Sequence, residues 1–168
     1  MRFSLYEKTY QEKDLLLNHK LESLEFCTPE NLGVNKEFLP LDLSEKPFQE
    51  SVRLLEEMNR AKTFSNKIEL LNQFRDKMLV EVKENRCMNR RKKREIQNMS
   101  SAEEDAKDDE WRAGADDTAP VLSYVFIKAN IRNHNAQFKY MNDWKGPEVQ
   151  LSPVAHMLAF YEGFLSFI

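Results

Sequence analysis

The chain has 168 residues, with 41% apolar side chains, 32% charged side chains and a formal net charge of -3. This length suits one domain with a buried core, and four glycines and six prolines supply too few turns for a many-stranded β fold. The small net charge gives no indication of a nucleic-acid partner, and two isolated cysteines, Cys27 and Cys87, indicate a reducing intracellular compartment rather than a disulfide framework.

The first 43 residues predict a helical segment followed by an irregular connection. No glycine or proline interrupts residues 2–28, so we expect one long helix or two joined helices that end at Thr28-Pro29. Residues 30–43 contain Gly33 and Pro40 and predict the irregular connection.

Two helices with apolar stripes follow. Residues 44–47 open the first, whose apolar side chains recur at helical spacing: Phe48, Val52, Leu55 and Met58. Thr63 and Ser65 are candidate N-caps of the second. Its stripe comprises Ile68, Leu71, Phe74, Met78 and Val82.

Residues 84–115 have a different composition, with a basic run at 90–94 and acidic runs at 103–105 and 108–110. Such a segment buries too little apolar surface to offset its ordering entropy. We expect its first half to extend the preceding helix and residues of about 98–113 to form a mobile loop, in which Trp111 is the only large apolar residue near the acidic part. The basic run is most simply a solvated helix extension, and contact with anionic lipid, nucleic acid or an import receptor is the alternative.

Three further helices complete an all-α fold, a single layered bundle of about six helices. Residues 118–130 are almost uncharged and predict a central, buried helix. Residues 132–144 place Phe138, Met141 and Trp144 on one side, and Ser152-Pro153 starts the last helix with proline behind a serine cap.

The chain lacks the common motifs of covalent and metal chemistry. It has no GxxxxGK[ST], GxSxG, HExxH or EF-hand pattern. His19, His134 and His156 have no cysteine or carboxylate at metal-ligand spacing. We therefore expect no metal and no cofactor. No stretch has the length of a transmembrane span, so we expect any membrane association to be peripheral or through a partner.

Two adjacent acids, Asp116 and Asp117, precede the central helix. The simplest interpretation is that one of them is the N-cap, because its carboxylate would accept a backbone N–H and favour the positive end of the helix dipole. Pro120 fits a first turn, where its missing N–H is not needed.

The block Gly-Ala-Asp-Asp-x-x-Pro-Val-Leu-x-Tyr-Val-x-Ile-Lys-Ala-Asn at 114–130 resembles the signature of the vacuolar-protein-sorting-nine (VPS-nine) domain. Weaker similarities flank it at residues 27–34, 46–48, 59–63, 137–141 and 164–168. The resemblance implies an all-helical guanine-nucleotide-exchange factor for Rab-five-type GTPases. We expect residues 1–26 to form one or two helices before the core. Residues 27–168 would form the VPS-nine-like domain, with a charged flexible insertion at about 84–115.

In that family the first acid of the block acts as a finger, a role that falls on Asp116. It enters the GTPase nucleotide site, engages the P-loop lysine and disfavours bound magnesium and phosphates, while Pro120 shapes the helix start that presents it. The resemblance assigns GTPase contacts to a further set of residues: Asp117, Tyr124, Lys128, Asn130, His156 and Ala159. An apolar groove between residues 118–130 and 152–168, with Asp116 at its edge, would receive the switch regions.

The chain departs from the family pattern at three positions. His156 and Ala159 stand where the family's last helix carries Tyr-x-x-Thr, and Ile131 replaces a proline. Three functions therefore remain open: an exchange factor that uses no covalent chemistry, a degenerate domain that binds a Rab GTPase without exchange, and an unrelated helical scaffold. The first implies a monomer that meets a GDP-bound or nucleotide-free GTPase in vesicle trafficking and endocytosis, in the cytoplasm and at the periphery of endosomal membranes.

Overall fold

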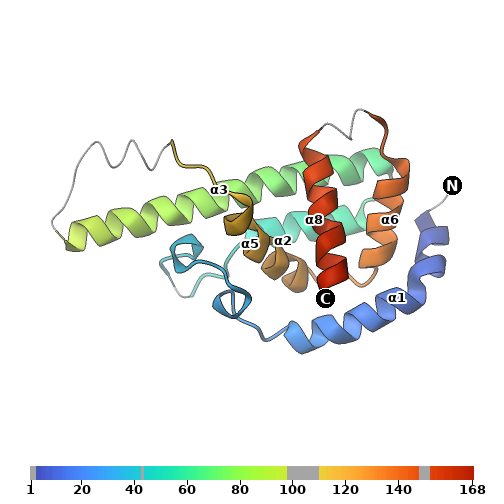
Figure 1. The fold of residues 1–168 in the computed structure, drawn as a ribbon, viewed down its shortest axis with the longest axis horizontal. Coiled ribbons are helices and arrows are strands. Elements are labelled where there is room, and N and C mark those ends of the chain that lie inside the picture. Colours follow the sequence, from blue (N-terminus) through green and yellow to red (C-terminus); the bar gives the residue numbers. More distant parts are fainter. Residues whose placement is uncertain (1–2, 43, 98–109, 148–151) are drawn as a thin grey trace.

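A computed structural model describes residues 3–42, 44–97, 110–147 and 152–168 (Figure 1). Within these ranges the chain is entirely helical, with six α-helices and two short 3₁₀ helices and no strand, which confirms the expected all-α bundle. The elements are α1 (Phe3–Leu24), η1 (Glu30–Leu32), η2 (Lys36–Phe38), α2 (Gln49–Arg60), α3 (Phe64–Ile96), α5 (Ala115–Lys128), α6 (His134–Trp144) and α8 (Pro153–Phe167).

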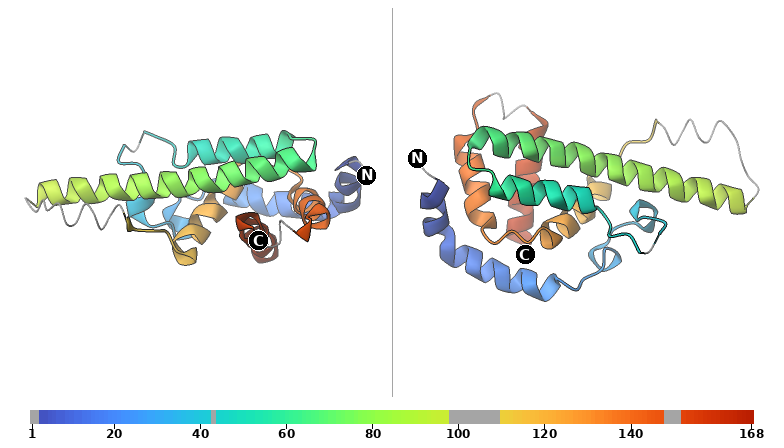
Figure 2. Two further views of the ribbon diagram at one scale, coloured as in Figure 1. Left: turned by 90° about the horizontal axis from the view of Figure 1, so that it is seen from above. Right: turned by 180° about the vertical axis from the view of Figure 1, so that it is seen from behind.

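Helices α2 and α3 form the long side of the bundle and run side by side (Figure 2). Thr63 is the N-cap of α3, as expected, and its hydroxyl accepts the Asn66 backbone N–H at 3.3 Å. The predicted apolar stripe of α3 faces the core, where Leu71, Phe74 and Val82 are fully buried. The helix continues through the basic run to Ile96 and projects beyond α2 (Figure 1).

Helix α5 lies against this pair and is the central helix that the uncharged sequence predicted. Six of its residues are buried: Val121, Leu122, Tyr124, Val125, Phe126 and Ile127. Phe126 joins it to α8, because its ring centroid lies 4.5 Å from that of Tyr161 and 4.9 Å from that of Phe164. The last two helices are α6, which begins at His134, and α8, which begins at Pro153 directly after its N-cap Ser152, as the sequence predicted.

The segment before α2 attaches at two places on the bundle. Helix α1 runs along α6, and the rings of Phe3 and Tyr6 both meet Tyr140 edge-on, at 5.3 and 5.4 Å. The expected irregular connection follows, and its η2 turn docks on α3. The mobile loop expected at about 98–113 falls mostly on residues 98–109, which lie outside the described residues.

Candidate functional site

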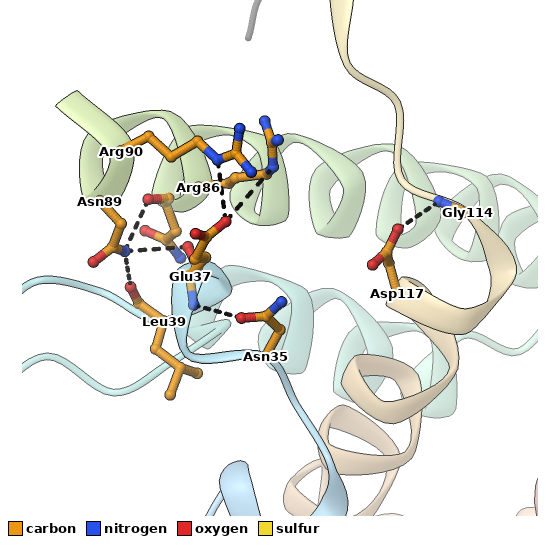
Figure 3. Close-up of polar contacts among 9 residues, drawn as sticks. Asn35, Glu37, Leu39, Arg86, Asn89, Arg90, Gly114 and Asp117 are labelled. Atoms are coloured by element: carbon orange, nitrogen blue, oxygen red, sulfur yellow. Dashed lines mark hydrogen bonds and ion pairs between the residues drawn. The ribbon is translucent and has the colours of Figure 1, made fainter. Parts of the chain in front are cut away.

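Helix α5 begins three residues earlier than the sequence predicted. Gly114 is its N-cap, in an extended conformation with φ -82° and ψ 178°, so neither Asp116 nor Asp117 holds the N-cap position. Instead Asp117 is the third helical residue, and its carboxylate accepts the Gly114 backbone N–H at 3.0 Å (Figure 3). The expectation was wrong because an acid in the first turn can cap by reaching back to the residue before the helix.

The two neighbouring acids therefore have different surroundings. Asp117 is half-buried and engaged in the cap, whereas Asp116 is exposed on the second residue of α5. Across the described part of the chain, no side chain or backbone group forms a hydrogen bond or ion pair with the Asp116 carboxylate. The fold thus uses one carboxylate and presents the other to solvent at the positive end of a helix.

Pro120 lies deeper in α5 than predicted, as the sixth helical residue rather than in the first turn. Because proline has no N–H, the backbone carbonyl of Asp116 lacks its usual donor four residues ahead. The Thr118 hydroxyl strengthens the opening turn instead, within 3.0 Å of the Gly114 carbonyl and 3.2 Å of the Ala115 carbonyl. Capping and side-chain bonds together hold the turn that carries Asp116.

Tyr124 and Lys128, two predicted GTPase contacts, are engaged within the fold. Tyr124 is 7% exposed and lies edge-on to Phe48 at 6.2 Å, and its burial raises the pKa of the phenol. The Lys128 ammonium donates a hydrogen bond to the Glu25 carbonyl and lies 5.5 Å from the centre of the Tyr124 ring. Both side chains therefore fix the C-terminal half of α5 against the segment that follows α1.

Asn130, His156 and Ala159 are exposed. Asn130 and Lys128 line a pocket of about 750 Å³ between α1 and the connection from α5 to α6. Neither Asp116 nor any residue of α8 lines this pocket, so the structure places the predicted residues at the α5 start, in this pocket and on the outer face of α8, apart from Tyr124, which is buried against Phe48. The groove expected between α5 and α8 stays a prediction.

Sequence reasoning missed a group of contacts just before α5. The sequence predicts that Trp111 lies in a mobile segment, yet its ring packs against the core beside Arg86 of α3 and Phe38 of η2. One feature of the sequence could have indicated that Trp111 packs on the core: it is the only aromatic residue between Ile96 and Gly114, in an otherwise charged segment.

The described residues show neither a metal-binding cluster nor a membrane-spanning helix. No group of three or more histidine, cysteine, aspartate or glutamate side chains in these ranges could hold a metal ion. No described helix is both long and apolar enough to cross a membrane.

The model of one protein family, described as the vacuolar sorting protein 9 (VPS9) domain, matches residues 48–168. The matched range runs from the residue before α2 through α8 and includes the start of α5 with Asp116, Asp117 and Pro120. No curated protein matches the chain.

Proposed function

The chain belongs to the VPS9 domain family, whose domains are in general exchange factors for Rab-five-type GTPases, and from this premise we propose that it promotes GDP release from such a GTPase. The resemblance that its sequence showed is confirmed, and the alternative of an unrelated helical scaffold is wrong. A VPS9 domain implies a small GTPase as partner. The GTPase supplies the nucleotide and the magnesium ion, so the exchange factor itself needs only a surface and a positioned charge.

The observation that carries the proposal is the division of roles between Asp116 and Asp117. If Asp116 capped α5, moving it into a partner would break the helix start. Because Asp117 accepts the Gly114 N–H, Asp116 is available without that cost. A carboxylate brought close to phosphate oxygens repels them, and it can pair with the cation that those oxygens leave. In this proposal Asp116 acts as the finger and Pro120 shapes the turn that presents it.

The other predicted residues have supporting roles in this proposal. Tyr124 and Lys128 hold the body of α5 in place, and Asn130 is exposed two residues after the helix ends. His156 and Ala159, on the outer face of α8, contact the GTPase switch regions. We place the reaction in vesicle-mediated transport and endocytosis, with the protein in the cytoplasm and peripheral to endosomal membranes, where it meets the GTPase as a monomer.

The test compares substitutions of the two acids in a fluorescent-GDP release assay across a panel of Rab GTPases. Asp116→Ala should abolish exchange and change the free energy of unfolding by less than about 1 kcal/mol, because the side chain loses only its interaction with the helix dipole and no hydrogen bond. Asp117→Ala should reduce stability by about 0.5–2 kcal/mol through the lost cap, while the folded fraction still exchanges nucleotide. Asp116→Asn, which keeps the shape and removes the charge, should behave like Asp116→Ala. Wild-type exchange by Asp116→Ala would overturn the finger role.

A second function is favoured by the two departures on α8. His156 and Ala159 remove a phenol and a hydroxyl from the face assigned to the switch regions. The domain would then bind a Rab GTPase without releasing its nucleotide. Capture of the nucleotide-free GTPase by a wild-type protein that releases no GDP would identify this function.

A further inference from the structure

The four residues before α5 are anchored to the bundle, because the Trp111 ring contacts side chains from two other elements, α3 and η2. The guanidinium carbon of Arg86, on α3, lies 4.3 Å from the centre of the indole ring. The Phe38 ring, on η2, lies 5.8 Å from it with an interplanar angle of 39°. A guanidinium at this distance over an indole face is an attractive cation–π contact.

Both partners of Trp111 are themselves fixed. Arg86 is only 6% exposed, and its Nε lies 3.9 Å from a carboxylate oxygen of Glu37. The same oxygen accepts a hydrogen bond from Arg90 Nε at 3.2 Å (Figure 3). Glu37 therefore ties two arginines of α3 to the η2 turn.

Two asparagines of α3 hold the backbone of that turn. Asn85 donates its side-chain amide to the Phe38 carbonyl at 2.9 Å. Asn89 donates to the carbonyls of Glu37 at 3.1 Å and Leu39 at 2.8 Å (Figure 3). Side-chain amides and an ion pair thus hold the η2 turn against α3. The indole ring packs on the surface that these two elements form, which includes a buried phenylalanine.

The Trp111 contacts lie close in sequence to Asp116. Trp111 precedes the N-cap Gly114 by three residues and Asp116 by five. The Gly114–Asp117 hydrogen bond then joins the end of this short segment to the first turn of α5. An exposed carboxylate can act on a nucleotide site only if its backbone is held in place, because small displacements of a reacting group cost much of its effect.

We propose that Trp111, clamped by Arg86 and Phe38, is a positioning residue that fixes the start of α5 and so aims Asp116 at the GTPase nucleotide site. The proposal rests on the exchange function proposed above. The indole touches neither nucleotide nor GTPase in this role. It acts through the backbone of residues 112–115, and its loss would blur the position of a finger whose own chemistry is intact.

The experiment measures GDP release at varied concentrations of the GDP-bound GTPase for three variants. Trp111→Ala removes the clamp, Trp111→Phe keeps an aromatic ring against Arg86, and Trp144→Phe is the control at the other tryptophan, on α6. We expect Trp111→Ala to lower kcat by about 10- to 100-fold with little change in KM, since the docking surface is untouched. Trp111→Phe should restore most of kcat, and Trp144→Phe should match wild type. A merely structural tryptophan would lower the folded fraction and leave kcat per folded molecule unchanged, and that result would overturn the proposal.

A second measurement covers the case in which Trp111→Ala fails to fold. In Trp144→Phe, Trp111 is the only tryptophan left. With excitation that selects tryptophan over tyrosine, the clamp predicts an emission protected from acrylamide. Adding Arg86→Met keeps the alkyl stem and removes the cation, so it should increase quenching and lower kcat together. Increased quenching at unchanged kcat would overturn the positioning role alone. A wild-type protein that releases no GDP while its Trp111 emission stays protected would overturn the proposed function and the role that depends on it.

Discussion

At the scale of single residues, His134 shows how deeply the fold buries an ionisable group. Its ring is 1% exposed at the junction of α5, α6 and α8, with Nδ1 2.7 Å from the Tyr161 hydroxyl. Burial lowers the pKa of His134 to about 3, because an imidazolium would lose its hydration there. The same burial raises the pKa of Tyr161, so this pair is neutral at physiological pH.

This burial predicts a loss of stability in mild acid. With a pKa of about 3 in the folded state and about 6.5 in the unfolded state, the unfolded chain binds more protons at intermediate pH. His134 therefore makes the free energy of unfolding fall as the pH drops from about 6.5 toward 3, by up to about 1.4 kcal/mol per pH unit. Urea unfolding at pH 7, 6 and 5 measures the slope. His134→Gln, which does not titrate, should show a shallower slope, and parallel slopes for the two proteins would contradict this assignment.

At the scale of elements, one helix caps another across most of the chain. The N-cap residue of α6, Asn133, makes no side-chain capping bond. Asp14 of α1 supplies the acceptor, taking the backbone N–H of Asn135 at 2.7 Å and that of Ala136 at 3.4 Å. Asp14 is 5% exposed, and burial raises the pKa of its carboxyl although these hydrogen bonds favour the charged form.

Asp14→Ala should therefore destabilise the protein by about 1–3 kcal/mol, because one part-buried and one buried N–H group at the start of α6 lose their acceptor. Glu12→Ala, at an exposed position of the same helix, is the matched control and should be close to neutral. Chemical denaturation gives the free energies, and hydrogen exchange should show faster exchange in α1 and in the first turn of α6. Equal stability of the two variants would mean that α1 is not held by this cap.

The elements also show what the sequence could predict. Thr63 was identifiable as a cap because its partner, Asn66, is three residues away, and the burial of α5 followed from its lack of charge. The start of α5 was predicted at the wrong residue because the capping by Gly114 and Asp117 depends on the backbone angles of the first turn. The sequence alone does not distinguish which of the two acids takes part in the cap. The Asp14 cap and the Trp111 clamp were beyond prediction, since each joins residues far apart in sequence and has no local pattern.

At the scale of the whole molecule, the proposed function depends on two separate surfaces. One is the start of α5, where Asp116 is exposed and the cap, Pro120 and the Trp111 clamp set its position. The other is the outer face of α8, where His156 and Ala159 are exposed three residues apart, on one side of the helix. Without a supporting face on α8, the protein would bind the GTPase weakly and release little GDP even with the finger intact. Altering α8 therefore tests the proposed function independently of Asp116.

Replacing His156→Tyr together with Ala159→Thr should raise kcat/KM for GDP release, because the pair adds a phenol and a hydroxyl that can hydrogen-bond to the switch regions. A gain of about 5- to 30-fold corresponds to one or two added hydrogen bonds worth about 1–2 kcal/mol. The matched control is His156→Phe with Ala159→Val, which adds the same bulk without the hydroxyl groups and should show no such gain. Adding Asp116→Ala to the Tyr/Thr pair should abolish the gain, since the restored face would hold a GTPase that no finger enters. An equal gain from the Phe/Val pair would show that apolar contact, rather than hydrogen bonding, governs this face. A Tyr/Thr gain that persists without Asp116 would separate the α8 surface from the finger mechanism.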